Sequence, residues 1–312
     1  MPHQATAVAR PARRVQVPAA ADGQRLDNFL LGELALPRTR IYRLIRKGEV
    51  RVNRGRAQPS TRLAAGDEVR IPPLREAPPG APAAVPEGLC ATLRAAQLLE
   101  APGLRIIDKP AGWASQPGSG VQTSLVEIAR ATFGEGWQPA HRLDRDTSGC
   151  LALVEGRPAM QAFTAGDWDK AYLALAHGAW TGPTEQRWED RLERRADGQV
   201  VAAQGDGGKF AAMQVRCLGS AGGASLLRCV LETGRTHQIR VQAALRGMPL
   251  LGDRRYGQRD RDAALGLAQR PGLTLHAWEL AGPWQGERLH ARAPLPAQWA
   301  PLLDALELEA PA

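Results

Sequence analysis

Apolar positions along the first quarter of the chain follow two different periods. Two stretches carry them at the spacing of one helix face, with Leu26, Phe29, Leu30 and Leu34 in the first and Ile41, Leu44 and Ile45 in the second. Residues 50–53 and 68–71 alternate between apolar and polar instead, which is the period of a half-buried strand. The pattern therefore predicts two helices followed by a small hairpin.

Beyond residue 95 the pattern changes to short apolar runs separated by polar loops. The runs at 104–107, 150–154, 171–176 and 226–231 are short and rich in Leu, Ile and Val, which indicates buried strands. Helical spacing occurs at 124–133, at 158–163 and after Thr236, which is a candidate N-cap. This mixture predicts an α+β domain with a mixed, mostly antiparallel sheet.

Proline-rich segments suggest where the domains end. Residues 72–86 contain six prolines with Ala and Gly between them, a composition typical of a semi-extended linker. Residues 1–21 are rich in Ala and Pro and have no apolar run, so we expect a disordered tail and no secretory signal. The expected order is a tail at 1–21, a small domain at 22–76, a linker at 77–94 and a large domain at 95–305.

Charge is concentrated in the small domain. The whole chain has a formal net charge of +8, and the segment from Arg25 to Arg75 holds 12 Lys or Arg against 5 Asp or Glu, a net of +7. Such a basic module beside a nearly neutral domain suggests a polyanion-binding attachment. No apolar run reaches 18 residues, and the four cysteines lack CxxC spacing. We therefore expect no membrane span, buried thiols and a reducing cytoplasm.

The densest polar cluster is the nine-residue string from His141 to Gly149, His-Arg-Leu-Asp-Arg-Asp-Thr-Ser-Gly. It leads directly into the apolar run that begins at Cys150. A polar loop before a buried strand is a place where a rigid scaffold can hold a reactive side chain. An exposed, salt-bridged turn is the alternative explanation for such a string.

The nine-residue string resembles the motif of the RluA family of RNA pseudouridine synthases. Further elements follow in the family's order, namely Lys109-Pro-x-Gly, Lys170-x-Tyr172, Gly208-Lys209, Thr233-Gly-Arg-Thr-His-Gln-Ile-Arg240 and Leu275-His-Ala. The first domain resembles the S4 RNA-binding domain. The resemblance covers residues 22–76 and 100–300, and it is greatest to the family's large-subunit ribosomal RNA enzymes, the RluC type. It implies the pseudouridine synthase fold.

The resemblance implies that the protein isomerises uridine to pseudouridine in structured RNA without a cofactor or a metal. Asp144 would be the catalytic carboxylate, attacking the base or the sugar or stabilising a sugar cation, and the sequence does not choose among these. Burial would favour its protonated form, so a paired arginine is needed, and Arg235 is the candidate. Tyr172 would stack on the target base and help to move the C5 proton.

Other residues are expected to hold the RNA. By the resemblance, Arg142 would occupy the space that the extruded base leaves, and Lys109 would contact the RNA backbone. The basic face of the S4-like domain adds candidate phosphate contacts at Arg43, Arg46, Lys47 and Arg51. His141 and His237 are either acid–base groups or hydrogen-bonded loop residues. We expect a monomer in the cytoplasm that binds RNA and no membrane.

Three alternatives remain at this point. The chain could be a non-catalytic RNA-binding or ribosome-assembly protein on the same fold, although a binder has no need of Asp144, Tyr172 and Arg235 together. It could act on tRNA instead of ribosomal RNA. A glycosidase using Asp144 and Asp146 would need carboxyl groups opposed across one bond, which neighbours two apart in a turn fit poorly.

Overall fold

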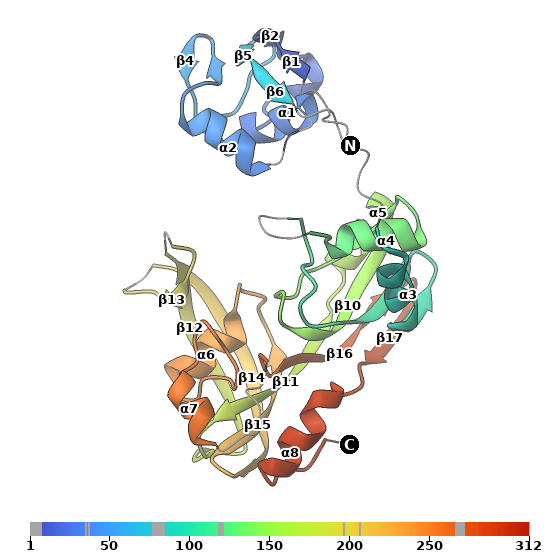
Figure 1. The fold of residues 1–312 in the computed structure, drawn as a ribbon, viewed down its shortest axis with the longest axis vertical. Coiled ribbons are helices and arrows are strands. Elements are labelled where there is room, and N and C mark those ends of the chain that lie inside the picture. The colour runs from blue at the N-terminus through green and yellow to red at the C-terminus, as the bar shows by residue number, and fades with distance from the viewer. Residues whose placement is uncertain are drawn as a thin grey trace, which may run out of the picture. The chain divides into compact units, whose positions relative to one another are not determined.

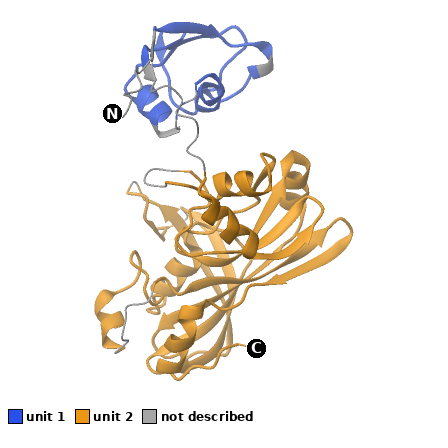
Figure 2. Ribbon diagram, turned by 45° about the vertical axis from the view of Figure 1, so that its right-hand side comes forward, with its two compact units in different colours: residues 1–84 blue, residues 85–312 orange. Residues whose placement is uncertain are grey.

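The computed structural model describes residues 8–34, 36, 38–76, 85–117, 122–195, 197–205, 207–265 and 272–311. The chain forms two compact units, residues 1–84 and 85–312, which Figure 2 colours separately. All four cysteines are free thiols. Within the described ranges, no helix has the length and apolar character that a membrane crossing requires.

The first unit contains the two expected helices and a small sheet. Its elements are β1 (Val8–Arg10), β2 (Arg13–Gln16), a 3-10 helix (Ala19–Ala21), α1 (Leu26–Glu33), α2 (Arg38–Arg46), β3 (Arg51–Val52), β4 (Gly55–Arg56), β5 (Glu68–Ile71) and β6 (Leu74–Glu76). The four-stranded sheet has the order β2-β5-β3-β4, and β1 pairs separately with β6. Leu26, Leu30, Ile41 and Ile45 are buried where both helices meet the sheet.

The prediction of a disordered tail at residues 1–21 is wrong from Val8 onward, and residues 1–7 lie outside the described residues. Strand β2 pairs antiparallel with β5, so that Val15 lies opposite Val69. Val17 and Ala21 are 3% and 7% exposed. The segment is ordered because it covers an edge of β5 that would otherwise present unpaired backbone groups.

The second unit carries the remaining elements. They are α3 (Glu87–Ala95), β7 (Gln97–Ala101), β8 (Leu104–Lys109), α4 (Leu125–Phe133), β9 (Trp137–Pro139), β10 (Ser148–Glu155), α5 (Gly156–Ala165), β11 (Asp169–His177), β12 (Glu185–Arg194), β13 (Val200–Ala202), β14 (Lys209–Ala221), β15 (Ala224–Leu231), α6 (Gln238–Leu245), α7 (Arg259–Ala264), β16 (Leu275–Trp284), β17 (Glu287–Arg292), a 3-10 helix (Ala297–Trp299) and α8 (Ala300–Ala305).

The predicted linker at 77–94 is corrected at its C-terminal end. Helix α3 occupies Glu87–Ala95 and buries Cys90 and Leu93, so this segment belongs to the second unit. Residues 77–84 lie outside the described residues. Leu93 joins the core that also contains Ile128 of α4, which explains why a segment next to a proline-rich stretch is ordered.

One large sheet organises the second unit. Its strands follow the order β13-β12-β14-β15-β11-β16-β10-β8-β7, with β17 paired to β16 and β9 to β10. Only the β10–β16 pair among these described strands is parallel. Figure 1 shows α3, α4 and α5 gathered at one end of the sheet and α6 and α7 at the other. The predicted α+β class with a mixed, mostly antiparallel sheet is confirmed.

The three central strands bring two of the sequence motifs together. Ala277 of β16 pairs with Tyr172 of β11 on one side and with Gly149 of β10 on the other. The polar string that ends at Gly149 therefore lies one strand away from Tyr172. Gly149 has φ +105°, and a Cβ there would overlap the carbonyl oxygen of Ala277. The close approach of these strands thus requires glycine at this position.

We predict that Gly149→Ala lowers the free energy of unfolding of the second unit by at least about 2 kcal/mol, because backbone strain and overlap act together. All eight tryptophans lie between residues 113 and 299, so tryptophan fluorescence in urea reports this unit. Gly247→Ala is the matched control, since Gly247 also has positive φ but a Cβ added there would meet no atom within 4 Å. Equal losses for the two variants would contradict the close-approach explanation.

Candidate active site

The polar string from His141 to Gly149 is held in place mainly through its backbone. The Ser115 hydroxyl donates to the carbonyl of Leu143 at 2.9 Å and accepts from its N–H at 3.3 Å. The N–H of Gly112 donates to the carbonyl of Arg145 at 2.8 Å. The side chain of Arg145 also donates, from Nε to the carbonyl of Gly112. These bonds fix the loop on both sides of Asp144.

Lys109 is buried and hydrogen-bonded within the protein, which disfavours the predicted contact with the RNA backbone. Its side chain is fully buried, and Nζ donates to the carbonyls of Pro110, Trp113 and Arg145 at 2.8 to 3.2 Å. Burial lowers the pKa of Lys109 to about 7, against the raising effect of Asp146 and Asp144. Because all three ammonium hydrogens have carbonyl acceptors, Lys109 stabilises the loop that contains Asp144.

Asp144 is paired with Arg240. The Nη1 of Arg240 donates to Oδ2 of Asp144 at 3.0 Å, while Nε and Nη2 form a bidentate pair with Asp253 at 2.7 and 2.8 Å. Asp253 also accepts from the backbone N–H groups of Arg255 and Tyr256. One guanidinium therefore joins a fully buried carboxylate to the one that faces the cavity.

The electrostatics keep Arg240 and Asp253 charged. Burial opposes charge on Arg240, but hydrogen bonds and charge from Asp253 and Asp144 raise the pKa of Arg240 above its ordinary value. Burial would likewise raise the pKa of Asp253, yet Arg240 and the two backbone donors hold that pKa below its ordinary value. Asp253 thereby fixes the position of Arg240, and Arg240 fixes that of Asp144.

The predicted pair between Asp144 and Arg235 is wrong. Arg235 lies in the exposed loop before α6, and its Nε donates to the carbonyl of Phe210 at 2.8 Å. Arg240 lies in the first turn of α6 and is 8% exposed. It belongs to the same sequence motif, and its position between Ile239 and Val241 in an apolar helix start was the signal that could have identified it.

The start of α6 also differs from the expected N-cap at Thr236. The helix begins at Gln238, and His237 is the N-cap residue with φ +55°. The Gln238 side-chain oxygen accepts from the N–H of Arg235 at 3.0 Å and from the Thr233 hydroxyl at 2.8 Å. The Gln238 side chain thus stabilises the turn before α6, and His237 in this turn lies close to Asp144.

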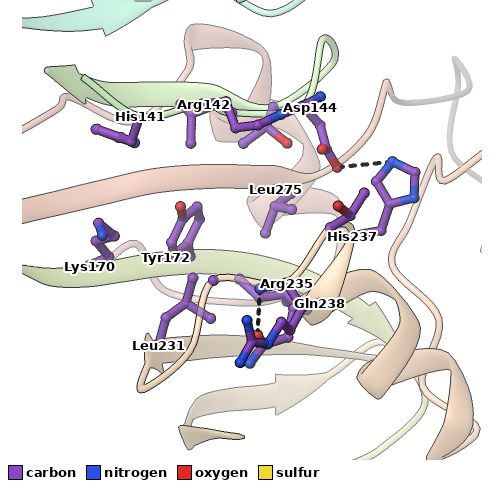
Figure 3. A pocket seen from close by; sticks show the side chains of 15 residues that line it. His141, Arg142, Asp144, Lys170, Tyr172, Leu231, Arg235, His237, Gln238 and Leu275 are labelled. Atoms are coloured by element: carbon purple, nitrogen blue, oxygen red, sulfur yellow. Dashed lines mark hydrogen bonds and ion pairs between the residues drawn. The ribbon is translucent and has the colours of Figure 1, made fainter. Parts of the chain in front are cut away.

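A cavity of about 280 Å³ lies in front of Asp144. Its lining includes Asp144 and His237 at one end, Tyr172 in the middle, and Lys170 and His141 at the other end, as Figure 3 shows. Tyr172 is 8% exposed, and burial, followed by the charge of Asp144, raises the pKa of its hydroxyl, which remains protonated at neutral pH. A space of this size is small for a ligand site and suits one nucleoside.

The two histidines of the site are neutral. His141 accepts at Nε2 from the N–H of Ala152 and stacks on Phe163, and burial lowers the pKa of His141 to about 3. His237 lies 3.7 Å from Asp144 and contacts the Tyr256 hydroxyl through Nδ1 at 2.7 Å. Burial also lowers the pKa of His237. Both are therefore hydrogen-bonded loop histidines.

The remaining candidates are exposed. Arg142 lines the cavity in front of Asp144 and also a second cavity of about 1000 Å³ that includes Asp144, Arg240, Arg254 and Arg255 in its lining. In the first unit the predicted phosphate contacts are exposed residues on or next to α2 and β3, namely Arg43, Arg46, Lys47 and Arg51. In the part of the chain that the structure describes, no three His, Cys, Asp or Glu side chains form a candidate metal site.

We predict that Arg240→Met lowers the free energy of unfolding by about 3 kcal/mol at neutral pH, because it leaves Asp253 buried without its partner. In the variant, burial raises the pKa of Asp253, so folding requires protonation and stability falls as pH rises above the unfolded pKa near 4. Urea unfolding at pH 5 and pH 8 measures this. Arg235→Met is the control and should lose less than about 1 kcal/mol at both pH values. A pH-independent loss for Arg240→Met would contradict the coupling.

Comparison with known proteins places this site in a family. Residues 103–245 match the family model described as RNA pseudouridylate synthase, and residues 24–69 match the S4 domain. The ribosomal large subunit pseudouridine synthase C of Salmonella typhi is 36% identical, covering 95% of this chain and 97% of that protein. The protein of the same name from Escherichia coli K12 is 37% identical, covering 90% and 92%.

Solved structures agree on the fold. Human RNA pseudouridylate synthase domain containing 4 superimposes with a TM-score of 0.61 at 24% identity, covering 72% of this chain and 98% of that one. Human RNA pseudouridylate synthase domain containing 1 gives a TM-score of 0.55 at 24% identity, covering 68% and 86%. With the sequence identity to the bacterial relatives and a carboxylate-bearing cavity at the matching motif, the chain belongs to the RNA pseudouridylate synthase family.

Proposed function

We propose that this chain isomerises specific uridines of large-subunit ribosomal RNA to pseudouridine, with Asp144 as the catalytic carboxylate. The observation that carries the proposal is the Arg240-held carboxylate at one end of a nucleoside-sized cavity walled by Tyr172. The names of the bacterial relatives, over nearly the whole chain, support ribosomal RNA of the large subunit as the substrate instead of tRNA.

The reaction breaks the N1–C1′ bond of uridine, turns the base within the site, and forms a C5–C1′ bond as the C5 proton leaves. Asp144 is paired with Arg240 and lines the cavity, so its carboxylate can attack the base or the sugar or stabilise a sugar cation. The detached base needs an enclosed site so that it does not escape. The cavity between the Asp144 loop and β11 supplies this enclosure.

We assign Tyr172 to direct contact with the target base. Its ring lies on the cavity wall, where it can stack on uracil. Its hydroxyl has no hydrogen-bond partner among the described residues, and burial keeps it protonated. We assign it to the transfer of the C5 proton late in the reaction. Arg235 also lines the cavity, and we assign it to substrate contact in place of the catalytic pairing role.

The target uridine must leave its stack, which costs a few kcal/mol. Arg142 is exposed at the mouth of the cavity and is positioned to fill the space that the base vacates. The adjoining cavity of about 1000 Å³, with Arg254 and Arg255 in its lining, has room and charge for neighbouring nucleotides. The exposed cations of α2 and β3 add phosphate contacts without sequence readout.

The assembled site argues against a non-catalytic binding protein, since burying a charged triad is unfavourable unless it has a use. The glycosidase alternative also fails on geometry, because Asp146 is exposed and lines only the second cavity. We propose that the protein acts as a monomer. Ribosomal RNA as the substrate supports the cytoplasm as the location.

We predict that Asp144→Asn abolishes isomerisation while RNA affinity stays nearly unchanged, because the amide keeps the shape but not the charge. Release of tritium from C5-labelled uridine in large-subunit ribosomal RNA measures turnover, and filter binding measures affinity. Asp146→Asn is the matched control and should retain turnover. Near-wild-type turnover in Asp144→Asn would remove Asp144 from its role, and no turnover by the wild type would overturn the proposed function.

We also predict that the double variant Arg43→Gln/Arg46→Gln weakens RNA binding and lowers the slope of log K against log salt by about 0.7–0.9 per lost phosphate contact. In the control variant Arg13→Gln/Arg14→Gln, the affected cations are already paired with Glu33 and Glu68, at 3.1 and 3.3 Å. The control should leave the slope almost unchanged. An equal slope in the wild type and the α2 variant would show that this helix does not bind RNA.

A further inference from the structure

Lys170 is a cation in the cavity that the reaction described above does not use. It lies on β11 two residues before Tyr172, so both side chains leave the same face of the strand, and Figure 3 shows them side by side. Lys170 is half-buried and has no hydrogen bond or ion pair with another described residue. Burial lowers the pKa of its ammonium, and only the charge of exposed Asp167 opposes this.

Around Lys170, the Tyr172 hydroxyl can accept a hydrogen bond but is assigned to the reaction, and the other neighbours labelled in Figure 3 supply a donor or an apolar surface. His141 faces it across the cavity, and because its Nε2 accepts from Ala152, its proton is on Nδ1. Leu231, nearby, is apolar. Asp144 lies at the opposite end, beyond Tyr172. Lys109 shows the contrast, since it is more deeply buried and has three carbonyl acceptors. Lys170 therefore has an ammonium free to donate to a ligand.

The chemistry of the proposed reaction specifies which edge of the base reaches this end. The uracil edge made of N1, C6 and C5 has to face Asp144 and the ribose, because N1 leaves C1′ and C5 replaces it. The opposite edge carries O4, N3 and O2, and it then points past Tyr172 toward Lys170. A phosphate attached to the ribose would lie at the other end, near the cavity mouth.

Resting on the proposed function, we infer that Lys170 donates a hydrogen bond to the O4 carbonyl of the target uracil and makes the site specific for uridine over cytidine. Cytosine presents an amino group at that position, so two donors would face each other and the desolvated ammonium would lose its acceptor. Lys170 is thus a specificity-determining residue.

The same contact survives the turn of the base. Rotation about the line through C6 and N3 exchanges N1 with C5 and also exchanges O2 with O4. A fixed donor that binds O4 of uridine therefore binds O2 after the turn, because O2 then stands where O4 stood. Lys170 can therefore bind the detached ring both before and after the turn. A contact to a phosphate, or to a ring atom that moves away in the turn, could not do this.

The test compares two RNA oligonucleotides spanning a uridine that the wild-type protein modifies. One carries uridine at the target, and the other carries 2-pyrimidinone riboside, which lacks O4. Affinity is measured in the Asp144→Asn background, so that substrate is not consumed, at several salt concentrations. Lys170→Met should bind the uridine RNA about 10-fold more weakly and the pyrimidinone RNA with unchanged affinity, since a hydrogen bond to a charged donor is lost only in the first.

Matched variants separate this result from other roles. Lys170→Gln retains an N–H donor and should recover part of the lost affinity for the uridine RNA. Lys47→Met removes a proposed phosphate contact, so it should weaken binding to both RNAs equally and lower the salt slope. Tryptophan fluorescence in urea verifies that each variant is folded.

Equal loss on both RNAs with a lower salt slope would show that Lys170 binds a phosphate, and the inference would be overturned. Unchanged affinity for both RNAs in Lys170→Met would overturn it as well. Conversion of the uridine oligonucleotide by the wild type, scored separately by tritium release, keeps these outcomes distinct from a failure of the proposed function.

Discussion

The arrangement of the active site depends on one guanidinium with two carboxylate partners. Arg240 is anchored by a bidentate pair to Asp253, which is fully buried, and its remaining nitrogen reaches Asp144 at 3.0 Å. A single cation beside an accessible carboxylate would be mobile and partly screened by water. Here the buried partner fixes the cation, so the accessible carboxylate is paired and oriented before substrate arrives.

The sheet supplies the second constraint, because it sets the distance between the carboxylate and the tyrosine. Strand β16 lies between β11 and β10, and Ala277 pairs with both Tyr172 and Gly149. The parallel β10–β16 pair allows the Asp144 loop to enter from the same edge at which Tyr172 emerges. A glycine is needed at position 149, where these strands approach each other. Gly149, at the end of the motif, is therefore required by the fold, whereas Asp144, in its middle, is assigned to the chemistry.

Sequence reasoning identified the elements and motifs well because periodicity and local strings report local structure. The order of helices and strands and the class of fold were accessible in this way, and the family resemblance singled out Asp144 and Tyr172, which line one cavity. It chose Arg235 over Arg240 because the fold of the 233–240 turn depends on a Gln238 side chain whose partners lie outside any periodic pattern. It also missed the strands before residue 21, since their partners β6 and β5 are distant in sequence.

Lys109 and Lys170 show why residue type alone could not assign the cations of the site. Both follow apolar or strand-like patterns and both line up with family motifs, yet Lys109 has three carbonyl acceptors and Lys170 has none among the described residues. A buried ammonium with its hydrogens satisfied stabilises the loop and has no donor left for a ligand. Lys170 is half-buried and has no acceptor among the described residues, so its ammonium is available to a ligand. The contrast therefore distinguishes Lys109, which stabilises the loop, from Lys170, which we assign to substrate binding.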